Sequence, residues 1–183
     1  TSHDRRAVPG FVVGSDFESG LALIKTTIPL PGPIMEIGDP SILGVGDTAC
    51  IAGSREANPQ AVEVHVVAKQ EFAGRWEYVL DKAIFTAPPY ESWSGAALLD
   101  QEGQLCGVGS LVIQGFEVNE TRRTTNMFVP IDLLPPIIDE ICEYGRRSTP
   151  PGPWLGLLVD DEDDGLIVVG VYRNCPADKA GLR

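Results

Sequence analysis

Ser94 is the residue of this sequence best placed to act as a nucleophile. It lies within residues 91–97, E-S-W-S-G-A-A, where small residues follow the serine at once and an apolar stretch comes next. A nucleophilic serine needs such a turn, because the turn exposes Oγ and small neighbours let a substrate carbonyl approach backbone N–H donors. Ser-Gly pairs also form ordinary turns, so this segment alone is also compatible with a turn that has no catalytic role.

Other reactive side chains are sparse and badly spaced for metal binding. No C-x-x-C pair occurs, and the sequence has only two histidines, His3 and His65. We therefore expect no metal and no cofactor, and free, buried thiols in a chain long enough to form a core without disulfide bridges. The acidic run at residues 160–164 suggests calcium, but a solvated hairpin turn is the favoured interpretation. The thiols in question are Cys50, Cys106, Cys142 and Cys175.

The overall charge restricts the class of partner. The 183 residues include 14 basic and 26 acidic ones, a formal net charge of −12. This charge repels nucleic acid and anionic membrane surfaces, which argues against either as the main partner. No apolar run approaches the ~18 residues of a membrane span. Residues 1–6 lack the apolar core of a signal peptide, so either there is no export signal or the chain begins downstream of one, and the compartment stays open.

Short apolar runs between 20 glycines and 15 prolines predict a mainly β protein. Residues 62–66, V-E-V-H-V, alternate with a period of two, as in a half-buried strand, and the polar loop 100–104 is typical of a hairpin turn. Many such strands indicate a sandwich or a barrel. One helix is expected, capped by Asp132, with Pro135 and Pro136 in its first turn and its end at Gly145.

Residues 148–153, S-T-P-P-G-P, predict a stiff linker that separates a domain at residues 1–147 from residues 154–183. This last segment has 30 residues, fewer than the ~40 that usually fold without staples. We therefore expect it to be the truncated start of a further domain.

The order of several segments resembles the HtrA/Deg family of trypsin-fold serine proteases. In that family a G-N-S-G-G-A-L loop leads through an Asp-x-x-Gly turn into G-V strands, and this sequence has S-W-S-G-A-A-L, then D-Q-E-G, then C-G-V-G. Residues 127–132, M-F-V-P-I-D, are similar to the strand end before the family's closing helix. Residues 175–182, C-P-A-D-K-A-G-L, are similar to the S-P-A-x-x-A-G-L signature of the attached PDZ domain. The resemblance covers nearly the whole chain.

This resemblance implies a mainly β, trypsin-like double β-barrel with a C-terminal helix, followed by the start of a PDZ domain at residues 154–183. The second barrel has all its segments, whereas the first lacks its opening strands. Half a barrel would expose an unpaired apolar edge. We therefore expect either a fragment of a longer chain or a second polypeptide that supplies the missing strands.

The resemblance assigns Ser94 as the nucleophile, and the mechanism also needs a histidine base and an aspartate that orients it. The aligned acid position, just before L-A-L-I-K, is Gly20, which can neither accept the histidine N–H nor stabilise an imidazolium. Asp16 matches a non-catalytic aspartate of the family and is interpreted as a turn residue. Neither histidine fits the role of base, since His3 matches a hairpin turn and His65 lies in a strand of the second barrel. The family's histidine, in a T-N-x-H-V context, precedes the part of the family that this chain covers.

The oxyanion hole expected from the resemblance uses the backbone N–H groups of Ser92 and Ser94. The family has glycine at position 92, and a Cβ there restricts the backbone. Glu91 stands where the family usually has proline, and its charge opposes a developing oxyanion. Trp93 replaces a small polar residue, and both a blocked or aromatic-lined subsite and a packed surface anchor stay open.

Two further sites follow from the resemblance alone. The specificity pocket has no charge at its base within residues 107–113 and suits a small to medium apolar side chain; its lining is Gly107, Val108, Gly109 and Ser110. The PDZ carboxylate-binding loop captures a peptide C-terminus through backbone N–H groups, and its counterparts are Trp154, Leu155, Gly156 and Leu157.

Three functions are compatible with this sequence. The favoured one is an HtrA/Deg-like, PDZ-bearing, peptide-binding protein that is catalytically impaired, because Gly20, Ser92 and Glu91 are three departures in one site. The second is an active serine endopeptidase with Ser94 as nucleophile and its histidine on a missing N-terminal segment. The third is a non-catalytic assembly protein. The implied partners are polypeptides or peptide C-termini, and homo-oligomer formation stays open.

Overall fold

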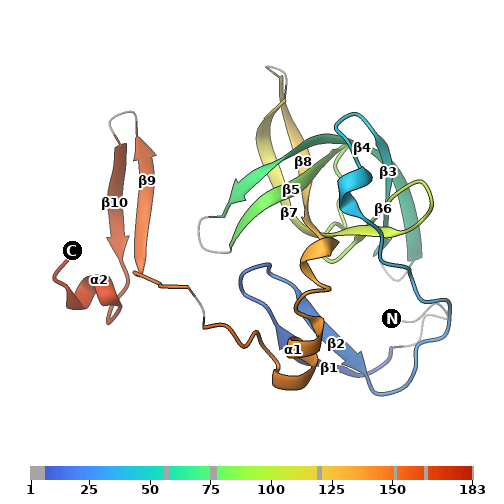
Figure 1. Ribbon diagram of the computed structural model, residues 1–183. Helices are drawn as coiled ribbons and strands as arrows, with labels where there is room; N and C mark the ends of the chain where they lie inside the picture. Colours follow the sequence, from blue (N-terminus) through green and yellow to red (C-terminus); the bar gives the residue numbers. More distant parts are fainter. Residues whose placement is uncertain are drawn as a thin grey trace. The chain divides into compact units, whose positions relative to one another are not determined.

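Six antiparallel strands form a closed barrel in the order β3-β4-β5-β8-β7-β6 (Figure 1). The computed structural model describes residues 7–55, 58–74, 78–118, 121–150, 152–162 and 165–182. These residues fall into two compact units, 1–148 and 149–183, and the barrel belongs to the first. Its strands are β3 (Thr48–Arg55), β4 (Asn58–Ala73), β5 (Val79–Ala87), β6 (Ala97–Leu99), β7 (Leu105–Val118) and β8 (Thr121–Pro130).

The barrel interior is built by the alternation that the sequence shows. In β4, Val64 and Val66 are buried and Glu63 and His65 are exposed, as the period of two predicts. The 3-residue strand β6 closes the barrel by pairing with β3 on one side and β7 on the other. The predicted hairpin turn at residues 100–104 joins β6 to β7. The interior is filled by Ile51, Val64, Val66, Ile84, Leu98 and Phe128, with smaller residues between them.

The C-terminal parts of β5 and β8 are buried on both faces, because a second apolar cluster covers the outside of the barrel there. Residues 83–86 of β5 and 125–130 of β8 are all buried. Ile84 points into the barrel, whereas Phe85 belongs to the outer cluster and stacks on Phe116 with ring centroids 4.2 Å apart. Leu21, from outside the barrel, packs in this outer cluster with Leu80 and Val129.

Leu21 belongs to the hairpin of β1 (Gly10–Ser15) and β2 (Ala22–Thr26), which forms a separate two-stranded sheet. Helix α1 (Ile138–Tyr144) lies beside this hairpin (Figure 1), and the Ser15 N–H donates to the Gly145 carbonyl at 3.2 Å. Gly14 permits the contact, since a Cβ there would overlap the backbone of Gly145. The mainly β architecture expected from the sequence is confirmed, with two strands described in the segment assigned to the first barrel.

The carboxylate of Asp16 ties the β1–β2 loop to the chain that follows α1. Asp16 is 4% exposed, and its Oδ2 accepts hydrogen bonds from the Ser19 N–H and hydroxyl and from Nη2 of Arg147 at 2.9, 2.5 and 2.9 Å. Its Oδ1 also lies 2.7 Å from Nε of Arg147, outside hydrogen-bond geometry. Burial alone would raise the pKa of Asp16, but the Ser19 and Arg147 contacts outweigh it and hold the pKa below 3.8.

Two expectations need correction. The helix begins at Ile138 rather than near Asp132, because Ile131–Leu133 form a short 3-10 turn, η2, and the two prolines lie between the two elements. Only two of the four free thiols are buried, those of Cys106 and Cys175, whereas Cys142 is exposed on α1. Burial and the nearby Asp100 carboxylate raise the pKa of Cys106 to about 11.

The second unit contains a hairpin of β9 (Leu157–Glu162) and β10 (Gly165–Val171) and the short helix α2 (Pro176–Lys179). The segment before β9 is fixed by its carbonyls: Gly156 accepts from the Tyr172 N–H at 2.9 Å and Leu155 from the Ala177 N–H at 3.1 Å. Within the residues described, no helix is long and apolar enough to cross a bilayer.

We predict that Asp16→Asn lowers the free energy of unfolding by about 3 kcal/mol at neutral pH, since it leaves Arg147 without its buried partner. Because the folded-state pKa of Asp16 is lowered, its stabilising effect is full above pH 3.8 and is lost as the pH falls through the folded-state value. Urea unfolding of both proteins should therefore show a difference that shrinks below about pH 4.

Glu18→Gln is the matched control, because Glu18 also pairs with Arg147, at 2.9 Å, but is 54% exposed. Its effect should stay within about 0.5 kcal/mol. An equal loss in the two variants would contradict a special role for the buried carboxylate.

Candidate active site

The turn that carries Ser94 connects β5 to β6 and exposes the serine. Gly95 adopts a left-handed φ of 71°, and the Ala96 N–H closes the turn onto the Trp93 carbonyl at 3.0 Å. Two hydrogen bonds of 2.8 Å join the turn to β7, from the Gly95 N–H to the Gly109 carbonyl and from the Gly109 N–H to the Ala96 carbonyl. The backbone therefore presents the Ser94 side chain at the surface on a fixed support.

A buried amide anchors the start of this turn. Asn126 of β8 is fully buried; its Oδ1 accepts from the Tyr90 N–H at 2.6 Å and its Nδ2 donates to the Tyr90 carbonyl at 3.1 Å. The Tyr90 ring lies over Gly53, where a Cβ would come within 2.9 Å of Cε1. Sequence reasoning missed both residues, because no local spacing connects positions 90 and 126.

The two N–H groups predicted to form the oxyanion hole are not used in hydrogen bonds within the described part of the protein. Among the described residues, the backbone N–H groups of Ser92 and Ser94 have no hydrogen-bond partner. Ser92 keeps a negative φ, since Asn174 is the one described non-glycine residue with a positive φ. Glu91 pairs with Arg55 at 2.9 Å, both side chains being more than half exposed, and this pairing together with solvent screening weakens the field that Glu91 exerts on the turn.

The position predicted to carry the triad acid is a glycine. Gly20 lies in the β1–β2 loop with φ 73°, and a Cβ there would overlap the ring of Tyr78, 2.8 Å from Cδ1. Asp16, four residues earlier, accepts hydrogen bonds from Ser19 and Arg147. It is therefore a turn residue, as predicted, and also a member of a buried ion pair.

The structure does not bring a histidine to Ser94. His65 lies exposed on β4 with Nδ1 3.4 Å from the Thr48 hydroxyl, and nothing in the described parts of the chain joins it to Ser94. His3 lies outside the described residues.

The residues predicted to line a specificity pocket lie at the start of β7. Gly109 has no room for a side chain, because a Cβ there would overlap the Trp93 carbonyl oxygen, and Gly107 packs against Phe128. The Ser110 hydroxyl is hydrogen-bonded to the Tyr78 hydroxyl. Their role in specificity stays a prediction.

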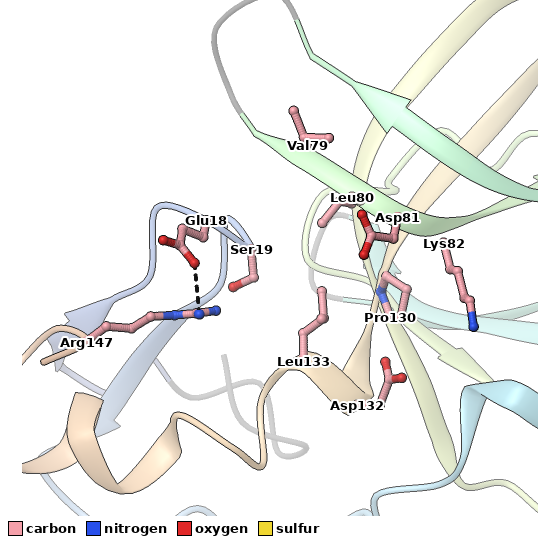
Figure 2. Close-up of a pocket in the computed structure, with 10 residues that line it drawn as sticks. All are labelled: Glu18, Ser19, Val79, Leu80, Asp81, Lys82, Pro130, Asp132, Leu133 and Arg147. Atoms are coloured by element: carbon pink, nitrogen blue, oxygen red, sulfur yellow. Dashed lines mark ion pairs between the residues drawn. The ribbon is translucent and has the colours of Figure 1, made fainter. Parts of the chain in front are cut away.

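A cavity of about 400 Å³ that the sequence did not reveal lies between the β1–β2 loop and the barrel (Figure 2). Figure 2 shows the Glu18–Arg147 ion pair on one side and Asp81, Lys82 and Asp132 on the other. The apolar residues that line this cavity are Val79, Leu80, Pro130 and Leu133. The described residues contain no cluster of three groups that could hold a metal ion.

A closed six-stranded barrel with an exposed serine on the β5–β6 turn is the second half of a trypsin-like peptidase architecture. The chain belongs to the family of trypsin-like peptidase domains, whose family model matches residues 1–108. Homology to HtrA/Deg serine proteases extends over the whole chain.

Individual relatives agree with this assignment. A DegP-like protein of Hahella chejuensis is 28% identical over 98% of this chain and 39% of its own length. The serine endoprotease DegS of Haemophilus influenzae is 26% identical over 94% of this chain and 51% of its own. The solved structure of the HtrA-type protease AlgW with a decapeptide superposes with a TM-score of 0.63 at 25% identity, over 99% of this chain and 57% of that one. The chain thus spans about half the length of these relatives.

We predict that Asn126→Ala destabilises the protein by about 1–3 kcal/mol, because it leaves the buried N–H and carbonyl of Tyr90 without partners. Urea unfolding measures the loss, and faster proteolysis within residues 90–96 would locate it at the serine turn. Gln60→Ala is the control, since Gln60 contacts the Tyr90 hydroxyl at 3.3 Å from an exposed position. A larger effect of the control would contradict the anchoring role.

Proposed function

We propose that this chain is the protease-type domain of an HtrA/Deg-like protein that binds polypeptides but is catalytically impaired, with the start of a PDZ domain at residues 154–183. The observation that carries the proposal is Gly20 at the triad acid position. A glycine cannot orient a histidine or stabilise its cation, and replacing the triad aspartate by a neutral amide already costs about 10⁴-fold in kcat in the type case.

The altered oxyanion region supports the same proposal. Ser92 holds a negative φ in place of the expected glycine, so its N–H is not free to adopt every orientation that glycine allows. The pairing of Glu91 with Arg55 weakens one of the three departures inferred from the sequence. The proposal therefore depends chiefly on position 20.

Peptide binding is supported by one relative and by the second unit. The AlgW structure contains a decapeptide, and this chain matches it over 99% of its length. In the described residues, the N–H groups of Trp154, Leu155 and Gly156 have no hydrogen-bond partner, while two of the three carbonyls are engaged. Three successive free N–H groups are what the capture of a terminal carboxylate requires.

One observation favours the alternative of an active serine endopeptidase. The Ser94 turn has an exposed hydroxyl, and the N–H groups of Ser92 and Ser94 beside it have no hydrogen-bond partner among the described residues. A histidine and an acid supplied from elsewhere would complete a catalytic site there.

A fluorophosphonate distinguishes the two functions, because it forms a stable adduct only with a serine that a neighbouring base activates. We predict that the full-length protein, incubated with the reagent and analysed by mass spectrometry, carries no more adduct at residue 94 than the Ser94→Ala variant carries on that peptide. Stoichiometric labelling of Ser94 would refute impairment and establish the endopeptidase.

A second experiment tests the peptide-binding site. In fluorescence anisotropy with a library of C-terminal peptides, we expect binders whose affinity falls about tenfold or more when the terminal carboxylate is amidated, because charge-assisted hydrogen bonds are lost. Gly156→Ala should abolish binding, since its Cβ would lie 2.6 Å from Sγ of Cys175.

Gly181→Ala is the matched control for this variant. Gly181 also has a positive φ, 90°, but its Cβ would meet open space. If no peptide binds, or if the two variants lose binding equally, the carboxylate-site proposal is wrong.

A further inference from the structure

The loop that carries position 20 is held rigidly, which fixes the direction of any side chain placed there. The Gly20 N–H donates to the Asp16 carbonyl at 2.9 Å, and the Asp16 N–H donates to the Leu21 carbonyl at 2.8 Å. The buried Asp16–Arg147 contact and the packing of Leu21 in the outer cluster hold the two ends of this loop.

The space in front of Gly20 is filled by Tyr78. A Cβ built at position 20 would overlap Cε1 of the Tyr78 ring and lie 2.8 Å from Cδ1 and 3.2 Å from Cζ. These are ring atoms, so a small adjustment of a flexible chain end cannot relieve the overlap. A carboxylate at position 20 would need the volume that the ring occupies.

Tyr78 is itself fixed from three directions. Its carbonyl accepts from the Gly74 N–H at 2.9 Å, its ring packs against the outer apolar cluster, and its hydroxyl is hydrogen-bonded to the Ser110 hydroxyl. Tyr78 thereby connects position 20 to the segment of β7 predicted to line the specificity pocket.

We infer that Tyr78 occupies the place of the triad acid, filling the volume of the side chain missing at Gly20 and fixing Ser110 through its hydroxyl. The inference deepens the proposed function and rests on it for the meaning of position 20. A neutral phenol engaged with Ser110 cannot supply the negative charge that stabilises an imidazolium. Gly20 and Tyr78 are therefore one coupled change, and an acid at position 20 requires a smaller residue at position 78.

A double-mutant cycle in urea unfolding tests the coupling. Gly20→Ala combines left-handed strain with the ring overlap, whereas Gly103→Ala has the same kind of strain, at φ 82°, and open space. We expect Gly20→Ala to raise the unfolding equilibrium constant at least about tenfold more than Gly103→Ala does, which corresponds to about 1.4 kcal/mol.

In the Tyr78→Ala background, the excess of the Gly20→Ala effect over the Gly103→Ala effect on the unfolding equilibrium constant should fall to about twofold or less. In the Tyr78→Phe background, which keeps the ring, this excess should persist. If Gly20→Ala alone does not fold, a folded Gly20→Ala/Tyr78→Ala protein supports the coupling equally. An excess that is absent from the start, or unchanged by Tyr78→Ala, overturns it.

A spectroscopic measurement tests the positioning of Ser110, which ring packing alone would not affect. In protein with 13C-labelled tyrosine, the Cζ resonance missing from Tyr78→Phe identifies Tyr78 among the four tyrosines. We expect Ser110→Ala to shift this resonance and Ser94→Ala to leave it in place. An unchanged resonance in Ser110→Ala overturns the hydroxyl contact.

These outcomes are independent of the proposed function. Fluorophosphonate labelling of wild-type Ser94 would reject impairment and leave the Gly20–Tyr78 coupling standing. A missing coupling without labelling would reject the role of Tyr78 and leave impairment standing.

Discussion

A buried carboxylate fixes the geometry on which the rest of the site depends. Asp16 accepts hydrogen bonds from the Ser19 N–H, the Ser19 hydroxyl and the guanidinium of Arg147, and so joins the β1–β2 loop to the segment that follows α1, 131 positions further along the chain. A buried acid of this kind is stable only with its partners in place. The loop that carries Gly20 and the apolar anchor Leu21 is therefore set against the outer face of β5 and β8, and the cavity in Figure 2 opens between them.

Positions 16 and 20 of the β1–β2 loop lie close together in the sequence but have different surroundings. The Asp16 carboxylate is held by Ser19 and Arg147, whereas Gly20 has no room for a side chain while the Tyr78 ring stays in place. The ring of Tyr78, which directly precedes β5, occupies the space in front of Gly20 and gains apolar contacts in the outer cluster.

The sequence predicted those features that depend on local patterns. The strand at residues 62–66 follows from alternation, the hairpin turn at 100–104 from polar residues with a glycine, and the serine turn from the ordered resemblance. The contacts between distant positions could not be predicted, because Asp16–Arg147, Tyr78–Ser110 and Tyr90–Asn126 have no spacing rule that one sequence reveals. The exposure of Cys142 was missed for a related reason, since α1 is only seven residues long and buries one narrow face.

The survival of the serine turn has a structural cause that does not involve catalysis. Strand β6 has three residues and closes the barrel between β3 and β7, so the turn before it must deliver the chain in register. The Asn126 amide fixes the entry to this turn, and the hydrogen bonds between Gly95, Ala96 and Gly109 fix its exit. These supports act on backbone groups of the turn and leave the Ser94 side chain exposed. Barrel closure therefore accounts for the shape of the turn at Ser94 without reference to catalysis, and the impairment that we propose depends on the hairpin, where position 20 meets Tyr78.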